Sequence, residues 1–442
     1  MANTYLTRTA GTPTSTQKGT FSAWVKRSSS ADARIFTSWG GGSRQFWLNF
    51  QTDSTDSHIS IADYDGSYNL RYLTNRKFRD FSAWYNVVFA IDTTLGTAGD
   101  RVKLYINGVQ ETSFSVSTAP SQNQVLNFAT SGDAHIIGKR DAEEYFNGSM
   151  SYVAFIDGKQ ELPTIFGETD ATTGEWKIKT TITPTSAWGN NGFFILKNGN
   201  SVTDQSGNSN NFTVGGGTLT KTEDSPSNVF ATINPLYYSS TGLLNGNVTA
   251  TSTGNSHKNY HSSIGVGSGK WYAEMKVNSW NGSNNIMFGI VADSWDNINK
   301  TSPGDNFAGN ASTGIGYGSN GQKIIANSAS SYGNSFTTGD ILGIALDLTN
   351  NKLYFSKNGT YQNSGVPTSG STGTGAIDVP SGFTRLITFS HYGSQSCSMN
   401  FGNGYFGTTA VSSAGTNASG NGIFEYDVPA NFTAISTKGL NL

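Results

Sequence analysis

Cysteine is almost absent from this sequence of 442 residues, which contains only Cys397. One thiol cannot form an internal disulfide, and it excludes zinc sites built from several cysteines. Charge is also scarce, because Asp, Glu, Lys and Arg make up 13% of the chain, against about 25% in a typical globular protein. With a net charge of -2 and no Lys/Arg block, the sequence predicts no surface for nucleic acid or for an anionic membrane.

Long hydrophobic runs are missing as well. No apolar stretch approaches the roughly 20 residues that a transmembrane helix needs, so we expect no membrane insertion. The N-terminal residues MANTYLTRTAG lack a charged segment followed by an apolar core. This predicts that there is no signal peptide and that the protein is made in a cytoplasm.

The motifs of common catalytic sites are not found either. There is no Gly-x-Ser-x-Gly nucleophile motif and no Gly-rich phosphate loop before a helix. Hydrolysis of a glycan needs two carboxylates that flank the scissile bond. The glutamates Glu143, Glu144, Glu161 and Glu168 fall in turn-like or irregular stretches, where solvated loop carboxylates are the favoured interpretation. We therefore predict that the protein is not an enzyme.

Glycine and aromatic residues, in contrast, are abundant, with 53 glycines and 12% aromatics. That combination is typical of short strands joined by polar turns. Alternating or continuous apolar strand patterns occur at residues 21–26, 84–91, 150–156, 271–277 and 341–348. The sequence therefore predicts an all-β fold, with Trp24, Trp84 and Trp271 as core residues.

Two segments of the chain share one pattern. Asn107-Gly108 and Asn358-Gly359 each follow a strand, and an Asn-Gly pair favours the type I′ turn of a β-hairpin because both residues need positive φ. In both segments the hairpin comes after a long apolar strand that ends in aspartate, at Asp92 and at Asp347. The repetition predicts two tandem antiparallel β-sandwiches of similar architecture.

We expect four regions along the chain. Residues 1–215 form the first sandwich, residues 216–235 a linker rich in turn-forming residues, residues 236–425 the second sandwich, and residues 426–442 a C-terminal extension. Within the first region, Pro163 is expected to open a single helical turn, because proline suits the first position of a helix.

Several pieces of the first region resemble the LamG, or concanavalin A-like, jelly rolls of bacteriophages. They are residues 20–27 (TFSAWVKR), 84–92 (WYNVVFAID), 103–108 (KLYING) and 150–158 (MSYVAFIDG). The piece at 166–176, FGETDATTGEW, is similar to the end of that module in marine phage proteins. The resemblance implies a lectin-type jelly roll over residues 1–215.

The second region resembles a SPRY domain. The matching pieces are residues 269–274 (GKWYAE), 288–291 (FGIV), 339–347 (GDILGIALD) and 353–359 (LYFSKNG). The order of all these pieces over nearly the whole chain is similar to that in virion proteins of marine and cyanophage type. The resemblance implies a concanavalin A-like jelly roll followed by a SPRY-like sandwich, in a protein located in the virion.

Relatives of these jelly rolls sometimes hold calcium with loop carboxylates and carbonyl oxygens. This makes Asp63 and Asp65 candidate Ca²⁺ ligands, because they flank Tyr64 directly before Gly66. An ordinary turn explains the same four residues without a metal, since Asp and Gly are common turn residues, and it is the favoured interpretation.

A glycan site needs accessible aromatic faces beside hydrogen-bonding side chains. Such faces are expected in loops, because aromatics in strands mostly belong to the core. The candidates are Tyr64, Tyr68 and Tyr145 in the first region, and Trp280, Asp293, Trp295 and Tyr332 in the second. The second set marks the loop region through which SPRY relatives bind partners. For each residue, local packing of a long loop is the alternative.

The leading hypothesis is a virion surface protein, of tail-fibre or capsid-fibre type, that binds host cell-surface polysaccharide during adsorption. A head-decoration or tail-assembly protein that binds other virion proteins is the first alternative, and a polysaccharide depolymerase is the second. No cofactor besides the candidate Ca²⁺ is expected. The oligomeric state stays open, and a homo-oligomer is compatible with the sequence.

Overall fold

The computed structural model describes residues 3–53, 56–140, 143–197, 199, 201–237, 242–252, 257–282, 286–293, 307–310 and 312–441. Strands make up 44% of the chain and helices 5%, which confirms the all-β fold class. The chain divides into two compact units, Met1–Lys221 and Thr222–Leu442. In the described part of the chain, no helix is long and apolar enough to cross a membrane.

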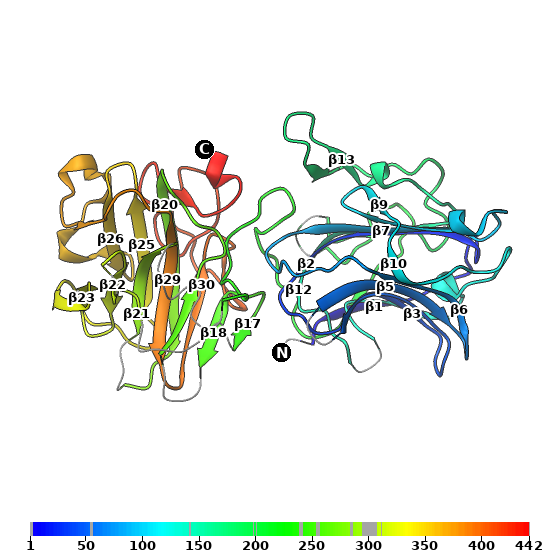
Figure 1. Ribbon diagram of the computed structural model, residues 1–442, viewed down its shortest axis with the longest axis horizontal. Helices are drawn as coiled ribbons and strands as arrows, with labels where there is room; N and C mark the ends of the chain where they lie inside the picture. The colour runs from blue at the N-terminus through cyan, green and yellow to red at the C-terminus, as the bar shows by residue number, and fades with distance from the viewer. Residues whose placement is uncertain are drawn as a thin grey trace. The chain divides into compact units, whose positions relative to one another are not determined.

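The first unit is built from two sheets. Their strands are β1 (Tyr5–Thr9), β2 (Lys18–Arg27), β3 (Ala33–Trp39), β4 (Gln45–Asp53), β5 (Asp56–Tyr64), β6 (Tyr68–Thr74), β7 (Tyr85–Asp92), β8 (Val102–Ile106), β9 (Val109–Glu111), β10 (Phe114–Thr118), β11 (Ala134–Ile137), β12 (Gly148–Asp157), β15 (Phe193–Ile195) and β16 (Thr213–Gly216). The eight-stranded sheet has the order β10-β6-β5-β4-β3-β11-β1-β16, and the six-stranded sheet has the order β15-β12-β2-β7-β8-β9. Figure 1 shows the two sheets stacked on each other.

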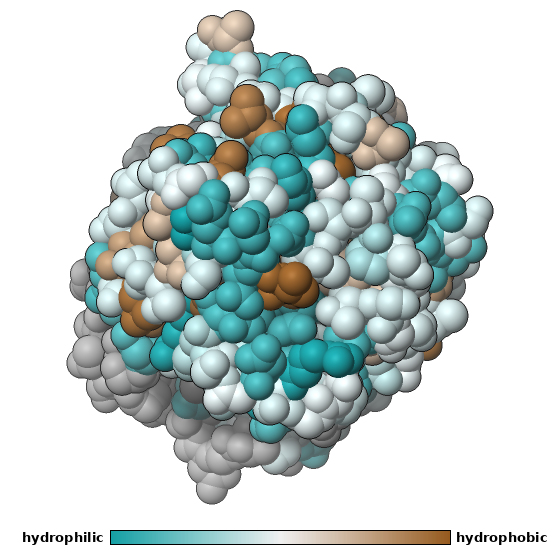
Figure 2. All heavy atoms as spheres, turned by 90° about the vertical axis from the view of Figure 1, so that its right-hand side faces the viewer, coloured by the Kyte–Doolittle hydropathy of each residue, from teal (hydrophilic) through white to brown (hydrophobic). Residues whose placement is uncertain are grey.

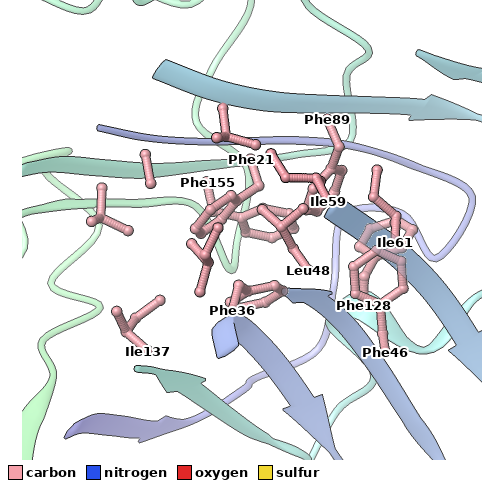
Figure 3. Packing of buried hydrophobic residues seen from close by; sticks show 14 of the residues in the cluster. Phe21, Phe36, Phe46, Leu48, Ile59, Ile61, Phe89, Phe128, Ile137 and Phe155 are labelled. Atoms are coloured by element: carbon pink, nitrogen blue, oxygen red, sulfur yellow. The ribbon is translucent and has the colours of Figure 1, made fainter. Parts of the chain in front are cut away.

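Phenylalanine rings fill the space between these sheets. Phe21, Phe89 and Phe155 come from the six-stranded sheet, and Phe36 and Phe46 come from the eight-stranded sheet (Figure 3). Phe21 stacks on Phe36 with ring centroids 4.9 Å apart, and all five side chains are fully buried. Burial of a side chain of this size contributes about 1.5–3 kcal/mol, so this cluster is a main source of stability for the unit.

The other face of the six-stranded sheet is covered by the segment that joins β12 to β15. The segment between β12 and β15 contains the short helix η3 (Pro163–Ile165), opened by proline as predicted, and the hairpin of β13 (Gly167–Thr169) and β14 (Trp176–Ile178). Figure 1 shows β13 on the far side of β7 from β5. Trp176 Nε1 donates a hydrogen bond to Asn86 Oδ1 at 3.1 Å, and Phe166 packs in one cluster with Val88. Burial on both faces explains the continuous apolar run of β7.

The second unit also contains two main sheets. Their strands are β17 (Leu243–Leu244), β18 (Thr249–Ser252), β19 (His257–His261), β20 (Lys270–Ser279), β21 (Met287–Ala292), β22 (Ile315–Gly318), β23 (Gln322–Ile325), β24 (Ser328–Ser331), β25 (Ile341–Asp347), β26 (Lys352–Lys357), β27 (Thr360–Tyr361), β28 (Ile377–Asp378), β29 (Arg385–Tyr392), β30 (Gln395–Asn400) and β33 (Thr433–Ala434). One sheet has the order β17-β18-β30-β20-β25-β26-β27, with β28 on β26 and β33 on β20. The other has the order β19-β29-β21-β22-β23-β24.

The predicted linker and C-terminal extension both contribute to folded units. Strand β33 pairs in parallel with β20, and Val428 and Phe432 pack against Tyr272. Phe230 is 1% exposed in the same cluster, whereas Gly216 pairs with Tyr5 in the first unit. Residues 216–235 and 426–442 are therefore largely integrated into the two sandwiches.

The two Asn-Gly hairpins have nearly the same geometry, which confirms the predicted turns. Asn107 and Gly108 have φ of 49° and 77°, and Asn358 and Gly359 have φ of 48° and 81°. Asn107 Oδ1 accepts a hydrogen bond from the backbone N–H of Asn86 at 2.7 Å. Asn358 Oδ1 accepts the equivalent bond from Ile341 at 2.8 Å. Positive φ at both turn residues matches the twist of the flanking strands, so the sequence selects this turn twice.

Candidate functional site

The outer face of the eight-stranded sheet, which points away from the phenylalanine core, carries accessible aromatic side chains. Phe46, Leu48 and Phe50 of β4 are fully buried in the core. Because successive side chains of a strand point to opposite faces, Trp47 and Asn49 lie on the outer face. Trp47 is half-buried there.

Strand register brings further outer-face residues beside Trp47. Trp47 pairs with Ala62 of β5, and Ala62 pairs with Arg71 of β6. In the next row, Tyr64 of β5 pairs with Tyr68 at the start of β6. Tyr68 is 42% exposed, so its ring is available to a ligand.

Trp47, Tyr68 and Tyr64 form a contiguous group, which we call the aromatic strip. The ring centroids of Trp47 and Tyr68 are 6.2 Å apart, and those of Tyr68 and Tyr64 are 5.1 Å apart. Both pairs meet edge to face, at interplanar angles of 67° and 65°. This arrangement is favourable for aromatic pairs. The structure therefore brings the predicted candidates Tyr64 and Tyr68 together and adds Trp47 to them.

Two arginines stack on the aromatic strip. Arg34 of β3 lies with Cζ 4.7 Å from the ring centre of Trp47, and Arg71 lies with Cζ 4.7 Å from that of Tyr68. Arg34 Nε also donates to Glu144 Oε2 at 2.5 Å, and Arg140 Nη1 donates to Glu144 Oε1 at 3.0 Å. Burial lowers the pKa of Arg34 from its usual value, although the nearby Glu144 carboxylate opposes this. Stacking on cations holds the rings in place.

Two buried polar atoms beside the strip have no hydrogen-bond partner among the described residues. They are Nη1 of Arg34 and Oδ1 of Asn49, in residues that are 4% and 3% exposed. Arg34 and Asn49 face each other across β3 and β4. Both atoms keep unused hydrogen-bonding capacity, as do buried polar atoms elsewhere in the two units.

The two candidate calcium ligands have different surroundings. Asp63 is fully buried, and its carboxylate accepts hydrogen bonds from the backbone N–H and Nδ2 of Asn127 and from Nδ2 of Asn69, at 2.6, 2.9 and 2.8 Å. Burial raises its pKa to about 6, although these hydrogen bonds oppose the rise. Asp65 is exposed. Within the described ranges, no group of three or more His, Cys, Asp or Glu side chains could hold a metal ion, and calcium binding stays a prediction.

The ring contacts of Tyr145 are with residues outside the aromatic strip. It is half-buried, and its ring centroid is 6.4 Å from that of Tyr5. Lys139 Nζ lies 3.8 Å from the ring centre of Tyr5 and 5.9 Å from that of Tyr145. These contacts give Tyr145 a packing role beside β1.

Comparison with known families accounts for both units. Residues 1–165 match the concanavalin A-like lectin/glucanases superfamily, and residues 270–404 match the SPRY domain. The chain carries a concanavalin A-like domain followed by a SPRY domain. No curated protein matches it.

Solved structures similar to the chain include SPRY domains and a pentraxin. A human SPRY domain is 14% identical, with 34% of this chain and 90% of that chain covered and a TM-score of 0.27. The SPRY domain of human HERC1 is 17% identical, with 34% and 86% covered and a TM-score of 0.27. A heptameric SAP-like pentraxin from Limulus polyphemus is 15% identical, with 36% and 72% covered and a TM-score of 0.28.

The candidates in the SPRY domain do not form a comparable group. Tyr332 directly follows β24 and is only 7% exposed, because its ring packs on Tyr317 and Phe355 with centroids 5.4 and 6.0 Å away. Its hydroxyl accepts a hydrogen bond from the backbone N–H of Phe355, and burial raises its pKa to about 12. The expectation that Tyr332 is an exposed loop residue was wrong, since it belongs to the core.

The other three SPRY candidates are placed differently. Trp280 follows β20 and is partly buried against the core of its unit. Asp293 follows β21 and is exposed, and its backbone N–H donates to Thr384 O at 3.0 Å. Trp295 lies outside the described residues. The concanavalin A-like domain therefore provides the better defined site.

Sequence reasoning missed Trp47, Arg34 and Arg71, although a signal for Trp47 was present. Residues 46–50 alternate as Phe-Trp-Leu-Asn-Phe, so the phenylalanines and the leucine share one face and Trp47 takes the opposite one. The positions of Arg34 and Arg71 on the same face depend on strand order and register, which one sequence does not specify.

Proposed function

We propose that the protein is a bacteriophage virion surface protein whose concanavalin A-like domain binds host cell-surface polysaccharide at the aromatic strip. The observation that carries this proposal is the contiguous group of Trp47, Tyr68 and Tyr64 on an accessible sheet face. Sugar rings present apolar C–H faces that pack on aromatic rings, while their hydroxyls need hydrogen-bonding neighbours. Gln45 and Arg71 supply such neighbours in the same two rows of the sheet.

In its described residues, the face of the molecule shown in Figure 2 carries no broad apolar patch. On the face shown in Figure 2, hydrophobic side chains occur in small separate groups within a mostly hydrophilic surface. Large contiguous apolar patches mark protein–protein or membrane interaction sites and ligand-binding grooves. The assignment to a phage virion is supported by the sequence pieces at residues 20–27, 84–92 and 166–176.

We propose binding without hydrolysis. A glycosidase needs one carboxyl group that can protonate the leaving oxygen and a second one across the bond. Glu144 is the carboxylate bound beside Trp47, through Arg34, and both of its oxygens accept hydrogen bonds from arginines. Asp63, which neighbours Tyr64, points into the core. Neither carboxylate is placed to act as the acid on a ligand at the strip.

The direct test is binding of purified host envelope polysaccharide to the full chain, measured by isothermal titration calorimetry. We expect Trp47→Ala and Tyr68→Ala each to weaken binding by about tenfold or more, because an aromatic stacking contact is worth roughly 1–3 kcal/mol. Tyr405→Ala is the matched control, since Tyr405 is a half-buried tyrosine of the second unit. Equal affinity for the strip variants and the wild type would disprove this site.

The virion assignment needs a separate measurement. We expect an image reconstruction of the intact particle to place the chain at the tail or on a projecting fibre, with the aromatic strip facing outward. Density on the capsid lattice with the strip buried against the shell would instead identify a decoration protein that binds other virion proteins.

A further inference from the structure

One arginine of the chain differs from all the others in its hydrogen bonds. The sequence contains ten arginines, and each lies within the described residues. Nine of them donate at least one guanidinium hydrogen bond to a protein oxygen. Arg71 makes no such bond and no ion pair with any described residue, and its one side-chain contact of note is the stack on Tyr68. Its guanidinium is therefore uncommitted.

The strands on either side of Arg71 place no charged residue directly opposite it. Arg71 pairs with Ala62 on one side and with Thr118 on the other, so both cross-strand neighbours are uncharged. Stacking on a ring uses the flat face of a guanidinium and leaves its N–H groups, which lie in the plane, able to donate. Arg71 is half-buried, so a ligand can reach it.

Two carboxylates near the strip are engaged elsewhere, and a third forms no ion pair with Arg71. Asp63 is on the core face and accepts three N–H groups, and Glu144 is held by Arg34 and Arg140. Asp65 is exposed in the turn before β6 and forms no ion pair with Arg71. The strip thus combines an accessible aromatic ring with an unpaired planar cation.

We propose that the aromatic strip selects an acidic sugar, whose ring packs on Tyr68 and Trp47 while Arg71 binds its carboxylate or sulfate group. This inference rests on the proposed glycan binding and specifies the class of glycan. A guanidinium matches the geometry of an oxyanion with two parallel N–H donors, which gives a stronger bond than a neutral hydroxyl accepts. A neutral glycan would leave the charge of Arg71 unmatched.

The experiment compares four purified polymers on the full chain: alginate and polygalacturonate as carboxylates, dextran sulfate as a sulfate, and dextran as a neutral control. We expect at least one acidic polymer to bind roughly 10- to 100-fold more tightly than dextran at low salt, the range of a charge-assisted hydrogen bond. The affinity should fall as salt is added, because ions screen the contact. The polymer that binds best shows whether the site prefers a carboxylate or a sulfate group.

Variants separate Arg71 from general charge. Arg71→Gln should remove the preference for the acidic polymer, and Arg71→Lys should restore part of it, because lysine keeps the charge but not the two-donor geometry. Arg76→Gln is the matched control, since Arg76 follows the same strand and already pairs with Glu111 at 2.8 Å. Melting curves check that each variant is folded.

The outcomes distinguish this inference from the proposed function. If dextran binds as tightly as the acidic polymers, or if Arg71→Gln keeps full preference, the inference is overturned while a glycan site at Trp47 and Tyr68 can stand. Failure of all acidic polymers to bind also overturns it. The proposed function is tested separately, by titrating host polysaccharide into Trp47→Ala. Loss of binding supports the site, and unchanged binding contradicts it.

Discussion

Lys270 Nζ lies 3.0 Å from Asp347 Oδ2, and the two residues face each other at the end of the β20–β25 pair. The first unit repeats this relationship, because Lys18 Nζ lies 3.1 Å from Asp92 Oδ2 at the end of the β2–β7 pair. In both units the aspartate closes the long apolar strand that leads to the Asn-Gly hairpin. The two ion pairs differ in burial, and this difference gives the first prediction.

Lys270→Ala is expected to destabilise the protein by about 2 kcal/mol, and Lys18→Ala by less than about 1 kcal/mol. The Asp347 side chain is 0% exposed, so loss of its partner leaves a buried charge. The Asp92 side chain is 12% exposed and its partner Lys18 is 37% exposed, so water can solvate the aspartate that Lys18→Ala leaves. Urea unfolding of the full chain, followed by tryptophan fluorescence, measures both. Equal losses would show that burial of the aspartate does not set the cost.

Glu274 gives a prediction about pH. Its side chain is fully buried, and its oxygens accept hydrogen bonds from the backbone N–H groups of Glu425 and Tyr426, both at 2.9 Å. Burial raises its pKa to about 7, from an ordinary value of 4.5, against the effect of these hydrogen bonds. The folded state therefore binds this proton more tightly than the unfolded state, so the stabilising contribution is complete below about pH 4.5 and is lost as pH rises through 7.

The stability difference between the wild type and Glu274→Gln isolates this group. We expect the wild type to lose roughly 2–3 kcal/mol relative to the variant between pH 5 and pH 8. Buried His135 and His261, whose pKa values burial lowers to about 3, act in the opposite direction but cancel in the difference. A difference that is constant with pH would contradict the prediction.

Gly359 is expected to tolerate no side chain. Its φ is 81°, and a Cβ at this position would come within 2.7 Å of the Tyr426 ring. Gly359→Ala should cost about 1–3 kcal/mol from backbone strain together with this contact. Gly339→Ala is the control, because its φ is 92° and no atom lies within 4 Å of its Cβ position. Thermal unfolding should show the larger loss for Gly359→Ala, and the reverse order would rule out the contact as the cause.

Cys397 should be unreactive until the protein unfolds. The residue is fully buried between β18 and β20, and burial raises the pKa of its thiol. Because the thiolate is the reactive form, both accessibility and ionisation protect it. We expect no reaction with a thiol reagent in native buffer and one equivalent after denaturation. Rapid labelling of the native chain would contradict the burial.

The fold could be predicted from the sequence because its signals are local. Alternation and apolar runs gave the strands, and Trp24, Trp84 and Trp271 are 3, 7 and 5% exposed, as expected for core residues. The turn chemistry of Asn107-Gly108 and Asn358-Gly359 needs no distant partner.

The site could be predicted only in part because it depends on contacts distant in sequence. The expectation that binding aromatics lie in loops was too narrow, since one face of the eight-stranded sheet keeps Trp47 accessible within a strand. The prediction for Tyr332 was wrong for the opposite reason. This residue lies outside a strand, yet its ring is buried against Tyr317 and Phe355 from other strands. Tyr64 and Tyr68 were found because they lie close to the turn that joins β5 and β6.

The two Asn-Gly turns also bear on how the molecule ages. An asparagine before glycine is prone to slow deamidation, in which the side-chain carbonyl carbon is attacked by the next backbone nitrogen. Here Asn107 Oδ1 and Asn358 Oδ1 are each held by a backbone N–H of the neighbouring strand, at 2.7 and 2.8 Å. The side chain must leave that bond before it can cyclise. The two turns that shape both sandwiches thus also slow the deamidation of their own asparagines, Asn107 and Asn358.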